Sequence, residues 1–318
     1  MFYILPLIII AFIASLIITK FEIPILREKA GQNIREDGPE SHLSKAGTPS
    51  MGGIAIIVGT IIATIAGALA LECDHIAVLC IILGFVGFGL IGFLDDYLKV
   101  IKKVNLGLRA YQKMGLQIII SVIFAIVAYI HEGGQVYIPF VKISVDFGWI
   151  YIPFVIFAVL AMTNAVNLTD GLDGLASGVT ALVSFFFAVA GLSFGVYAGS
   201  WFCAAMCGGC LGFLVFNKNP AKVFMGDTGS LALGGGLAAA AVVMRLELLL
   251  IIVGLLYVIE ALSVVLQVGY FKLSGGKRIF KMAPIHHHFE KCGFKEVQVV
   301  VAFWIFTAIC CLAGFFII

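Results

Sequence analysis

The stretch IAVLCIILGFVGFGLIGFLDDYLK, residues 76–99, joins an uncharged apolar run to two adjacent aspartates and a lysine. A helix of about 20 apolar residues crosses the hydrocarbon core of a bilayer. Carboxylates at the end of such a helix are costly unless they pair, bind a metal or face water. The stretch therefore predicts a membrane-spanning helix that carries chemistry at one end.

The rest of the 318-residue chain has the same character, with 62% hydrophobic residues, only 12% charged residues and a mean hydropathy of +1.12. This is more apolar surface than a soluble core can use, so we expect an all-α, polytopic membrane protein with a single domain over residues 1–318. The net charge of +2 is too small for nucleic-acid binding through a diffuse basic field. Ten spans are predicted, near residues 2–19, 51–71, 76–94, 114–130, 149–166, 174–192, 199–216, 230–246, 248–271 and 299–318.

The first apolar run, residues 2–19, is expected to be a retained span and not a removed signal peptide. No basic residue precedes it, and no small-residue cleavage site follows it.

Loop charges predict the orientation, because Lys and Arg accumulate in loops that stay in the cytoplasm. Eighteen of the 20 basic residues lie in the first, third, seventh and ninth loops, whereas the alternate loops hold only Lys142 and Arg245. We therefore expect both termini to be extracytoplasmic. The outside segment 131–148 alternates short β-prone runs with Gly and Pro, which predicts a small hairpin.

Two of the eight cysteines, Cys207 and Cys210, form a CGGC sequence inside an apolar, glycine-rich run. No histidine or acidic residue is nearby, so close helix packing by small residues is favoured over a metal or redox pair.

Five aspartates fall at three predicted helix ends on the cytoplasmic side: Asp95 and Asp96 in FLDDYLK, Asp170 and Asp173 in NAVNLTDGLDGLA, and Asp227 in VFMGDTGS. Their convergence predicts a site. Asp95 and Asp96 diverge by about 100° on a helix, so we expect them to have different roles. Asp227 lies in a turn just before a helix, where Mg²⁺ held by carboxylates and substrate phosphates fits well.

The fifth span has a pattern of its own, because Asn164, Asn167, Asp170 and Asp173 recur every three residues. A continuous helix would present them as one polar stripe that cannot face lipid. Gly171 would let the backbone break there and approach a ligand. A lined cavity explains the stripe better than a helix-end cap does.

The ninth loop contains MAPIHHHFE, with His286, His287 and His288 in succession. Successive side chains point in different directions, so three zinc ligands from this run would be strained, and phosphate binding or site architecture is favoured. The first loop contains KAGTPSMGG, in which Lys45 and a flexible turn that includes Ser50 lead into the second span. Ordinary helix entry is the alternative interpretation of that motif.

Glu260 is the one acidic residue predicted deep within a span. A proton path, a helix kink and a hydrogen-bonded structural carboxyl are all open interpretations of it.

Carboxylates, lysines and histidines gathered at a membrane surface suit a reaction between a polyanionic soluble substrate and a lipid phosphate. The motifs KAGTPSMGG, FLDDYLK, NAVNLTDGLDGLA, VFMGDTGS and PIHHHFE, in this order, closely resemble the polyprenyl-phosphate N-acetylhexosamine-1-phosphate transferases over essentially the whole chain. The PIHHHFE form is similar to that of the bacterial branch that transfers phospho-N-acetylmuramoyl-pentapeptide.

The resemblance implies transfer of this group from UDP-MurNAc-pentapeptide to undecaprenyl phosphate, which yields lipid I and UMP with Mg²⁺ in peptidoglycan synthesis. It also implies a homodimer in the bacterial cell membrane with its active site on the cytoplasmic face. Carried over by motif, Asp227 is the Mg²⁺ ligand, and Asp95 or Asp96 is the base that deprotonates the lipid phosphate. The implied substrate-binding residues are Lys45, Ser50, Asn167, Asp170, Gly171, Leu172 and Asp173 around the nucleoside and phosphates, Phe224 against uracil, and Lys99, Lys113, His286, His287 and His288 on phosphates.

Two mechanisms are open: direct attack by the lipid phosphate, which is favoured, or a covalent phospho-sugar intermediate on an aspartate. The nearest alternative function is transfer of N-acetylglucosamine-1-phosphate, against which only the histidine-rich loop argues. An intramembrane aspartyl protease would place its aspartates within the hydrocarbon. A transporter would use Glu260 and the polar stripe.

Overall fold

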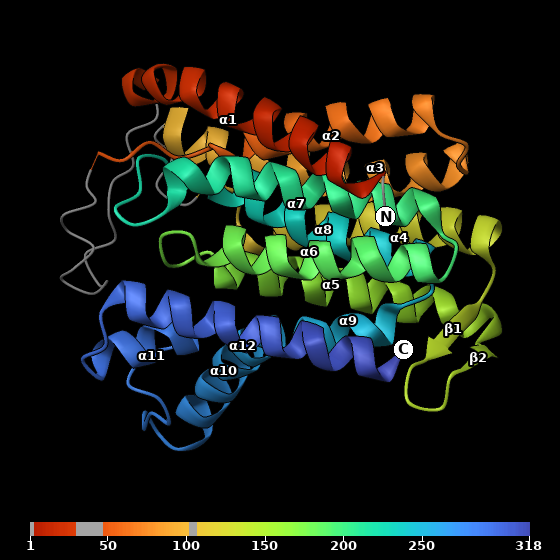
Figure 1. Ribbon diagram of the computed structural model, residues 1–318. Helices are drawn as coiled ribbons and strands as arrows, with labels where there is room; N and C mark the ends of the chain where they lie inside the picture. The colour runs from red at the N-terminus through yellow and green to blue at the C-terminus, as the bar shows by residue number, and fades with distance from the viewer. Residues whose placement is uncertain (1–2, 30–46, 102–106) are drawn as a thin grey trace.

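The computed structural model describes residues 3–29, 47–101 and 107–318 and is a bundle of long helices with one small hairpin (Figure 1). The helices are α1 (Ile4–Lys29), α2 (Gly53–Ala70), α3 (His75–Asp96), α4 (Ala110–Glu132), α5 (Tyr151–Thr169), α6 (Leu175–Ser193), α7 (Tyr197–Asn217), α8 (Gly226–Val243), α9 (Glu247–Val253), α10 (Leu255–Leu273), α11 (Ile285–Lys291) and α12 (Glu296–Ile317). A π-helical turn, η2 (Tyr97–Ile101), follows α3, and a 3-10 turn, η3 (Gly148–Ile150), precedes α5.

Within the described residues, ten helices are long and apolar enough to cross a membrane, which confirms the predicted number of spans and the all-α, multi-pass fold. Several boundaries differ from the prediction by a few residues, and two differ more. The first helix continues to Lys29, and the predicted ninth span 248–271 is divided between α9 and α10. The division occurs at Gly254, whose backbone leaves the helical region (φ −90°, ψ 22°) and where a Cβ would lie 2.6 Å from the carbonyl oxygen of Leu250.

The predicted hairpin is present as strands β1 (Gln135–Ile138) and β2 (Ile143–Asp146), paired antiparallel with Val136 opposite Val145. The amide of Tyr137 donates to the carbonyl of Arg245 and so ties the hairpin to the turn before α9. Both chain ends lie toward this end of the bundle, which we call the hairpin end (Figure 1). The opposite end, where α3 ends and α8 begins, is called the site end. Which side of a membrane each end faces stays a prediction.

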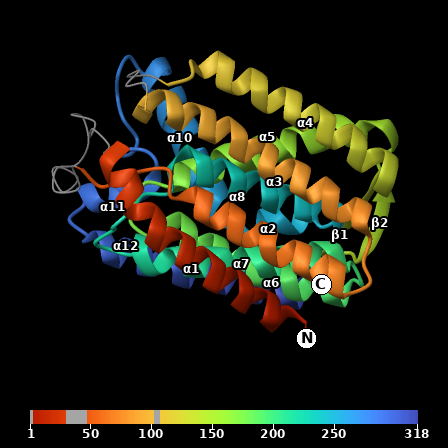
Figure 2. The same ribbon diagram turned by 90° about the horizontal axis from the view of Figure 1, so that it is seen from above.

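Helix α8 forms the centre of the bundle, and every residue from Thr228 to Val243 is buried. It packs against α2, α3 and α5, while α1, α2, α3 and α4 succeed one another across one face (Figure 2). Small residues allow these close contacts. At Gly92 in α3 a Cβ would lie 2.1 Å from the carbonyl oxygen of Asp227. The end of α3 is therefore held directly against the start of α8.

The CGGC run lies in the middle of α7 and serves helix packing, as expected. At Gly208 a Cβ would lie 2.1 Å from the carbonyl oxygen of Ile8 in α1. Cys207 and Cys210 are buried free thiols.

Candidate active site

Asp96, the last residue of α3, caps α8 from a neighbouring helix. Its Oδ2 accepts hydrogen bonds from the amide and the hydroxyl of Thr228 (2.8 and 2.6 Å), and its Oδ1 accepts from the amide of Asp227 (3.2 Å). The first amides of a helix lack partners within it, and the helix dipole favours an anion there. Both oxygens of this buried carboxylate are thus engaged in positioning Asp227.

Asp95, its neighbour, faces a different set of groups. Its Oδ2 forms an ion pair with Lys99 at 2.5 Å and lies 3.8 Å from the ammonium of Lys113. Its Oδ1 accepts from the amide of Leu108 at 2.7 Å. The two adjacent aspartates therefore have different environments, as their divergence on a helix predicts.

Asp227 lies in the first turn of α8, since this helix begins at Gly226 and not after the aspartate as predicted. Its Oδ2 accepts from the ammonium groups of Lys99 (2.9 Å) and Lys113 (2.8 Å), and its Oδ1 accepts from the amide of Asn167 (2.8 Å). The contacting groups come from the π-turn after α3, from α4 and from α5. One carboxylate thus joins four segments at the site end.

The polar stripe expected along the fifth span is interrupted, because α5 ends at Thr169. Asp170 leaves the helical region (φ −80°, ψ 54°), and Gly174 adopts a left-handed conformation with φ 79°. Asn164 stays within the helix and pairs with Gln117 at 2.9 Å. Asp170 and Asp173 therefore lie on a loop, residues 170–174, which we call the aspartate loop.

The carboxylate of Asp170 differs from its neighbours, because among the described residues it has neither a hydrogen-bond donor nor an ion-pair partner. Burial, together with the charges of Asp227, Asp96 and Asp173, raises the pKa of Asp170 to about 7. An additional cation at this point would relieve the repulsion.

Asp173 and its neighbours fix the aspartate loop to other parts of the chain. Oδ2 of Asp173 accepts from Asn219 (3.1 Å) and from the amide of Ala221 (3.0 Å), while its own amide donates to Glu296 (2.7 Å). The side-chain oxygen of buried Asn217 accepts from the amide of Gly174 at 3.1 Å. The loop is therefore held at several points by α7, α12 and the segment after α7.

The three consecutive histidines point to three different partners, as the strain argument against a zinc site predicts. His287 Nδ1 lies 2.8 Å from Glu290, and His288 Nδ1 accepts from the amide of Lys281 at 3.1 Å. His286 is fully buried against Glu260. The ring of His286 also lies against Gly171 of the aspartate loop.

Comparison with known proteins adds a sequence relationship to this geometry. A family model described as glycosyl transferase family 4 matches residues 78–245, and phospho-N-acetylmuramoyl-pentapeptide-transferase signature 1 matches residues 45–57. A phospho-N-acetylmuramoyl-pentapeptide-transferase of Clostridium novyi (strain NT) is 51% identical over 97% of this chain and 94% of its own length. One of Clostridium kluyveri (strain NBRC 12016) is 52% identical over 97% of both chains. The chain belongs to this transferase family.

The signature of this transferase family covers the segment that enters α2, and the segment also contacts the start of α8. The amide of Phe224 donates to Pro49 (2.8 Å), and the amide of Gly52 donates to Phe224 (2.9 Å). Ser50 is buried beside Gly226, where a Cβ would lie 3.0 Å from its hydroxyl oxygen. Phe224 is therefore close to Asp227 along the chain, and Ser50 lies beside Gly226, the residue before Asp227, in space. Lys45 lies outside the described residues.

Leu172, one of the residues assigned to substrate binding, has an apolar side chain that is 3% exposed and belongs to the hydrophobic core. This side chain is therefore enclosed by protein and not directed at the surface of the aspartate loop.

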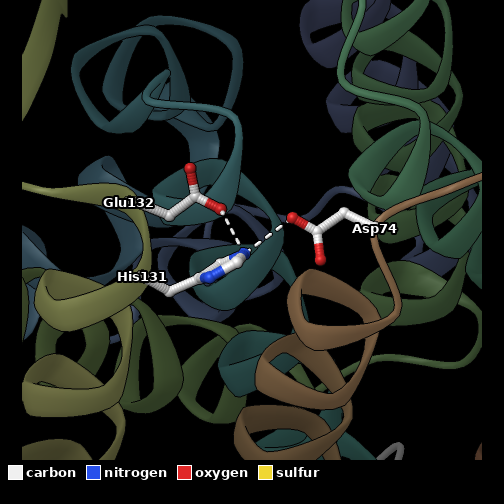
Figure 3. A group of neighbouring side chains, drawn as sticks. All are labelled: Asp74, His131 and Glu132. Carbon is white, nitrogen blue, oxygen red and sulfur yellow. Dashed lines mark hydrogen bonds and ion pairs between the residues drawn. The ribbon is translucent and has the colours of Figure 1, made fainter.

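A second group of candidate metal ligands lies at the hairpin end, where ligand atoms of Asp74, His131 and Glu132 are within 4.8 Å of one another. Figure 3 shows the ring of His131 between the two carboxylates, with both contacts on the same ring nitrogen, at 2.7 Å from Asp74 and 3.7 Å from Glu132. Glu132 also lies 3.5 Å from Arg245, and Asp74 caps α3 by accepting from the amide of Ile76. These groups pair with one another and connect α3, α4 and the turn before α9.

The charges at the hairpin end also affect titration. Burial opposes ionisation of Asp74, but the amide of Ala77 and the ring of His131 lower the pKa of this carboxyl overall.

Several residues at the site end were not predicted from the sequence. Thr228 and Asn217 hold Asp96 and the aspartate loop, and Glu296 begins α12 beside Asp173. Polar residues at helix ends were a usable signal for them, because each lies within a turn of an apolar span. Their partners, however, are more than 40 residues away in sequence.

Proposed function

We propose that this protein transfers phospho-N-acetylmuramoyl-pentapeptide from UDP-MurNAc-pentapeptide to undecaprenyl phosphate, releasing UMP and forming lipid I in peptidoglycan synthesis. Family membership supports the substrate assignment. The observation that carries the chemistry is Asp227, a carboxylate at the end of a buried helix, held by two lysines and an asparagine from neighbouring segments. A lipid phosphate and a soluble nucleotide can meet at such a helix end.

We propose Mg²⁺ as the metal, because the donor set fits a hard cation. Asp227, with the carboxylate of Asp170 that is unpaired among the described residues nearby, offers carboxylate oxygens, the ligands that Mg²⁺ prefers. Lys99 and Lys113 neutralise Asp227 in this structure. Their ammonium groups therefore mark the position at which this carboxylate would bind a metal cation. With Asp227 as a metal ligand, the two lysines would be released to contact phosphate oxygens. A bound Mg²⁺ would supply charge neutralisation on the diphosphate.

Asp95 is the better candidate for the base that deprotonates the lipid phosphate. Both oxygens of Asp96 accept hydrogen bonds from the first residues of α8, whereas Oδ2 of Asp95 contacts the ammonium groups of Lys99 and Lys113 and accepts no backbone hydrogen bond among the described residues. In the proposed step, an oxygen of the lipid phosphate attacks the β-phosphorus of the donor. A new P–O bond forms, the bond to the α-phosphate breaks, and UMP leaves.

The remaining assignments follow from the same proposal. The site end faces the cytoplasm, because 18 of the 20 basic residues lie in the loops predicted on that side. Asn167 of α5 and the aspartate-loop residues Asp170, Gly171, Leu172 and Asp173 bind the nucleoside and phosphates, and Phe224 stacks on uracil. A homodimer is carried over from the resemblance to the family.

Donor-specific release of UMP by the purified protein tests the proposal. With undecaprenyl phosphate and Mg²⁺, we expect UMP from UDP-MurNAc-pentapeptide and none from UDP-N-acetylglucosamine. UMP from the second donor alone would assign the protein to N-acetylglucosamine-1-phosphate transfer.

A further inference from the structure

Glu260 of α10 and His286 of α11 form a pair that is completely buried. Nδ1 of His286 lies 3.0 Å from Oε2 of Glu260, and both side chains are 0% exposed. The second polar atom of each, Oε1 of Glu260 and Nε2 of His286, is buried without a hydrogen-bond partner. Buried polar atoms in native proteins are nearly always satisfied, so these two require an explanation.

The unpartnered nitrogen is directed at the aspartate loop. A Cβ built on Gly171 would lie 2.2 Å from Nε2 of His286, so the imidazole rests directly on the backbone of this glycine. Gly171 follows Asp170, the carboxylate that has no partner among the described residues. His287 and His288 have partners elsewhere. In the described structure, the unpartnered Nε2 of His286 thus faces the aspartate loop.

Two residues on the buried face of α10, Gln267 and Glu260, fix the position of α11 and of its histidine. Oε1 of Gln267 accepts from the amides of Ile279 (3.0 Å) and Phe280 (2.9 Å) and so anchors the loop that leads to α11. Two turns earlier, Glu260 meets the histidine ring itself. A carboxylate only accepts hydrogen bonds, so it places a proton on Nδ1 and leaves Nε2 directed at the loop.

We propose that Glu260 is a positioning residue, which fixes the orientation and tautomer of His286 so that Nε2 accepts a hydrogen bond from an N–H or O–H group of the UDP-linked donor at the aspartate loop. The proposal deepens the function proposed above and rests on it. The donor supplies the hydrogen-bond partner that Nε2 lacks. Because Gly171 covers Nε2 in this structure, donor binding is expected to shift the loop.

A double-mutant cycle tests this inference with four variants: Glu260→Gln, His286→Ala, the double variant, and Ser263→Ala as control. Gln is close to Glu in size, so the fold is retained, but its amide can donate as well as accept and no longer sets the tautomer. Ser263 is buried on the same face of α10 and bonds only the carbonyl of Glu260. The readouts are kcat and KM for the donor, together with the thermal unfolding midpoint.

We expect Glu260→Gln to lower kcat/KM for the donor by about 10- to 100-fold, the range typical of residues that orient a ligating histidine. The double variant should be no less active than His286→Ala, because Glu260 acts through His286. Ser263→Ala should stay within about twofold of wild type, since it loses only a hydrogen bond to a backbone carbonyl and leaves the side chains of Glu260 and His286 in place. Losses that multiply in the double variant, or a Glu260→Gln variant as active as Ser263→Ala, would overturn the inference.

The same experiment separates this inference from the proposed function. Each variant is assayed in parallel with UDP-MurNAc-pentapeptide and UDP-N-acetylglucosamine. The donor from which wild-type protein releases UMP decides the function, and the cycle is then evaluated with that donor. If wild-type protein releases UMP from neither donor, both proposals are contradicted.

Discussion

Two charged clusters lie at opposite ends of α3 and α4, separated by roughly 33 Å, the length of a 22-residue helix. The cluster at the hairpin end is balanced. Asp74 and Glu132 surround His131, and Arg245 lies on the far side of Glu132. Asp74 is exposed to solvent, and its other oxygen caps α3. Every group there has a partner, so the role of connecting helices is sufficient to explain why these charged residues lie together.

The cluster at the site end is more deeply buried and, among the described residues, has more carboxylates than cations. Asp95 and Asp227 share the ammonium groups of Lys99 and Lys113, whereas Asp96 and Asp170 have no ion-pair partner within the described part of the chain. Asp95 and Asp96 are 2% and 4% exposed. Excess negative charge at such buried positions is costly, and natural folds retain it where it binds a cation or performs chemistry.

The difference teaches that residue type alone does not identify a site on this protein. Carboxylates, a basic residue and a suitable spacing occur at both ends of the same two helices. Burial and charge balance separate the end that connects helices from the end that is available for a metal and phosphates. Changes at the two ends should therefore have very different consequences.

The largest effect is expected from Asp227→Asn. The variant removes the charge that two lysines and the proposed Mg²⁺ share, so UMP release should fall by on the order of 10³-fold. Asp74→Asn, the matched change at the hairpin end, should retain full activity. Both variants should insert in membranes and elute as folded protein in size-exclusion chromatography. Near-normal activity of Asp227→Asn would remove this residue from the metal role.

Removal of divalent metal should have the next largest effect. Chelation with EDTA should stop UMP release, and added Mg²⁺ should restore it, because the diphosphate oxygens need neutralisation. Mg²⁺ should also raise the unfolding midpoint of wild type and of Asp74→Asn, since a ligand that binds the native state stabilises it. Full activity in EDTA would show that the lysines alone neutralise the site.

A smaller effect is expected from Gly171→Ala at the aspartate loop. The new methyl group would lie 2.2 Å from Nε2 of His286, so the ring or the loop must shift. We expect a loss of about tenfold or more in kcat/KM for the donor, because catalysis depends on ångström-scale positioning. The control is Gly269→Ala in α10, where no atom lies within 4 Å of the new methyl group. Equal activity of the two variants would contradict the close contact.

The smallest effect is expected at the hairpin end. Asn caps a helix as well as Asp does, so Asp74→Asn loses only the attraction to His131, worth below about 1 kcal/mol for an exposed pair. The pKa of Asp74 is lowered in the folded protein, so this stabilisation is present above the pKa of a free aspartate, near 4, and is lost as the pH falls. Unfolding midpoints should differ slightly at pH 7 and converge as the pH falls below about 4. A difference that grows in acid would contradict this sign.

The sequence was sufficient to predict the ten spans and the hairpin, because apolar length and turn residues act locally. It also indicated that Asp95, Asp96 and Asp227 come together, since alternating spans return helix ends to the same side. It did not indicate that Asp96 caps α8 or that α5 ends at Thr169. Capping partners from other helices depend on how helices cross, which has no signature in residue spacing.

Glu260 illustrates the same limit. A buried carboxyl was expected from its position within an apolar run, and three interpretations of it were open. To choose among them, one must know how the ninth loop folds. This loop brings His286, which follows Glu260 by 26 residues, back into contact with α10. Tertiary contacts of this kind follow from loop geometry and not from periodicity.

Binding of Mn²⁺, a paramagnetic substitute for Mg²⁺, tests most directly whether the site end and not the hairpin end holds the metal. Electron paramagnetic resonance of the purified protein can count bound ions in wild type, Asp227→Asn and Asp74→Asn. We predict one bound ion in wild type and in Asp74→Asn, and none in Asp227→Asn. An ion that persists in Asp227→Asn and disappears in Asp74→Asn would contradict the assignment.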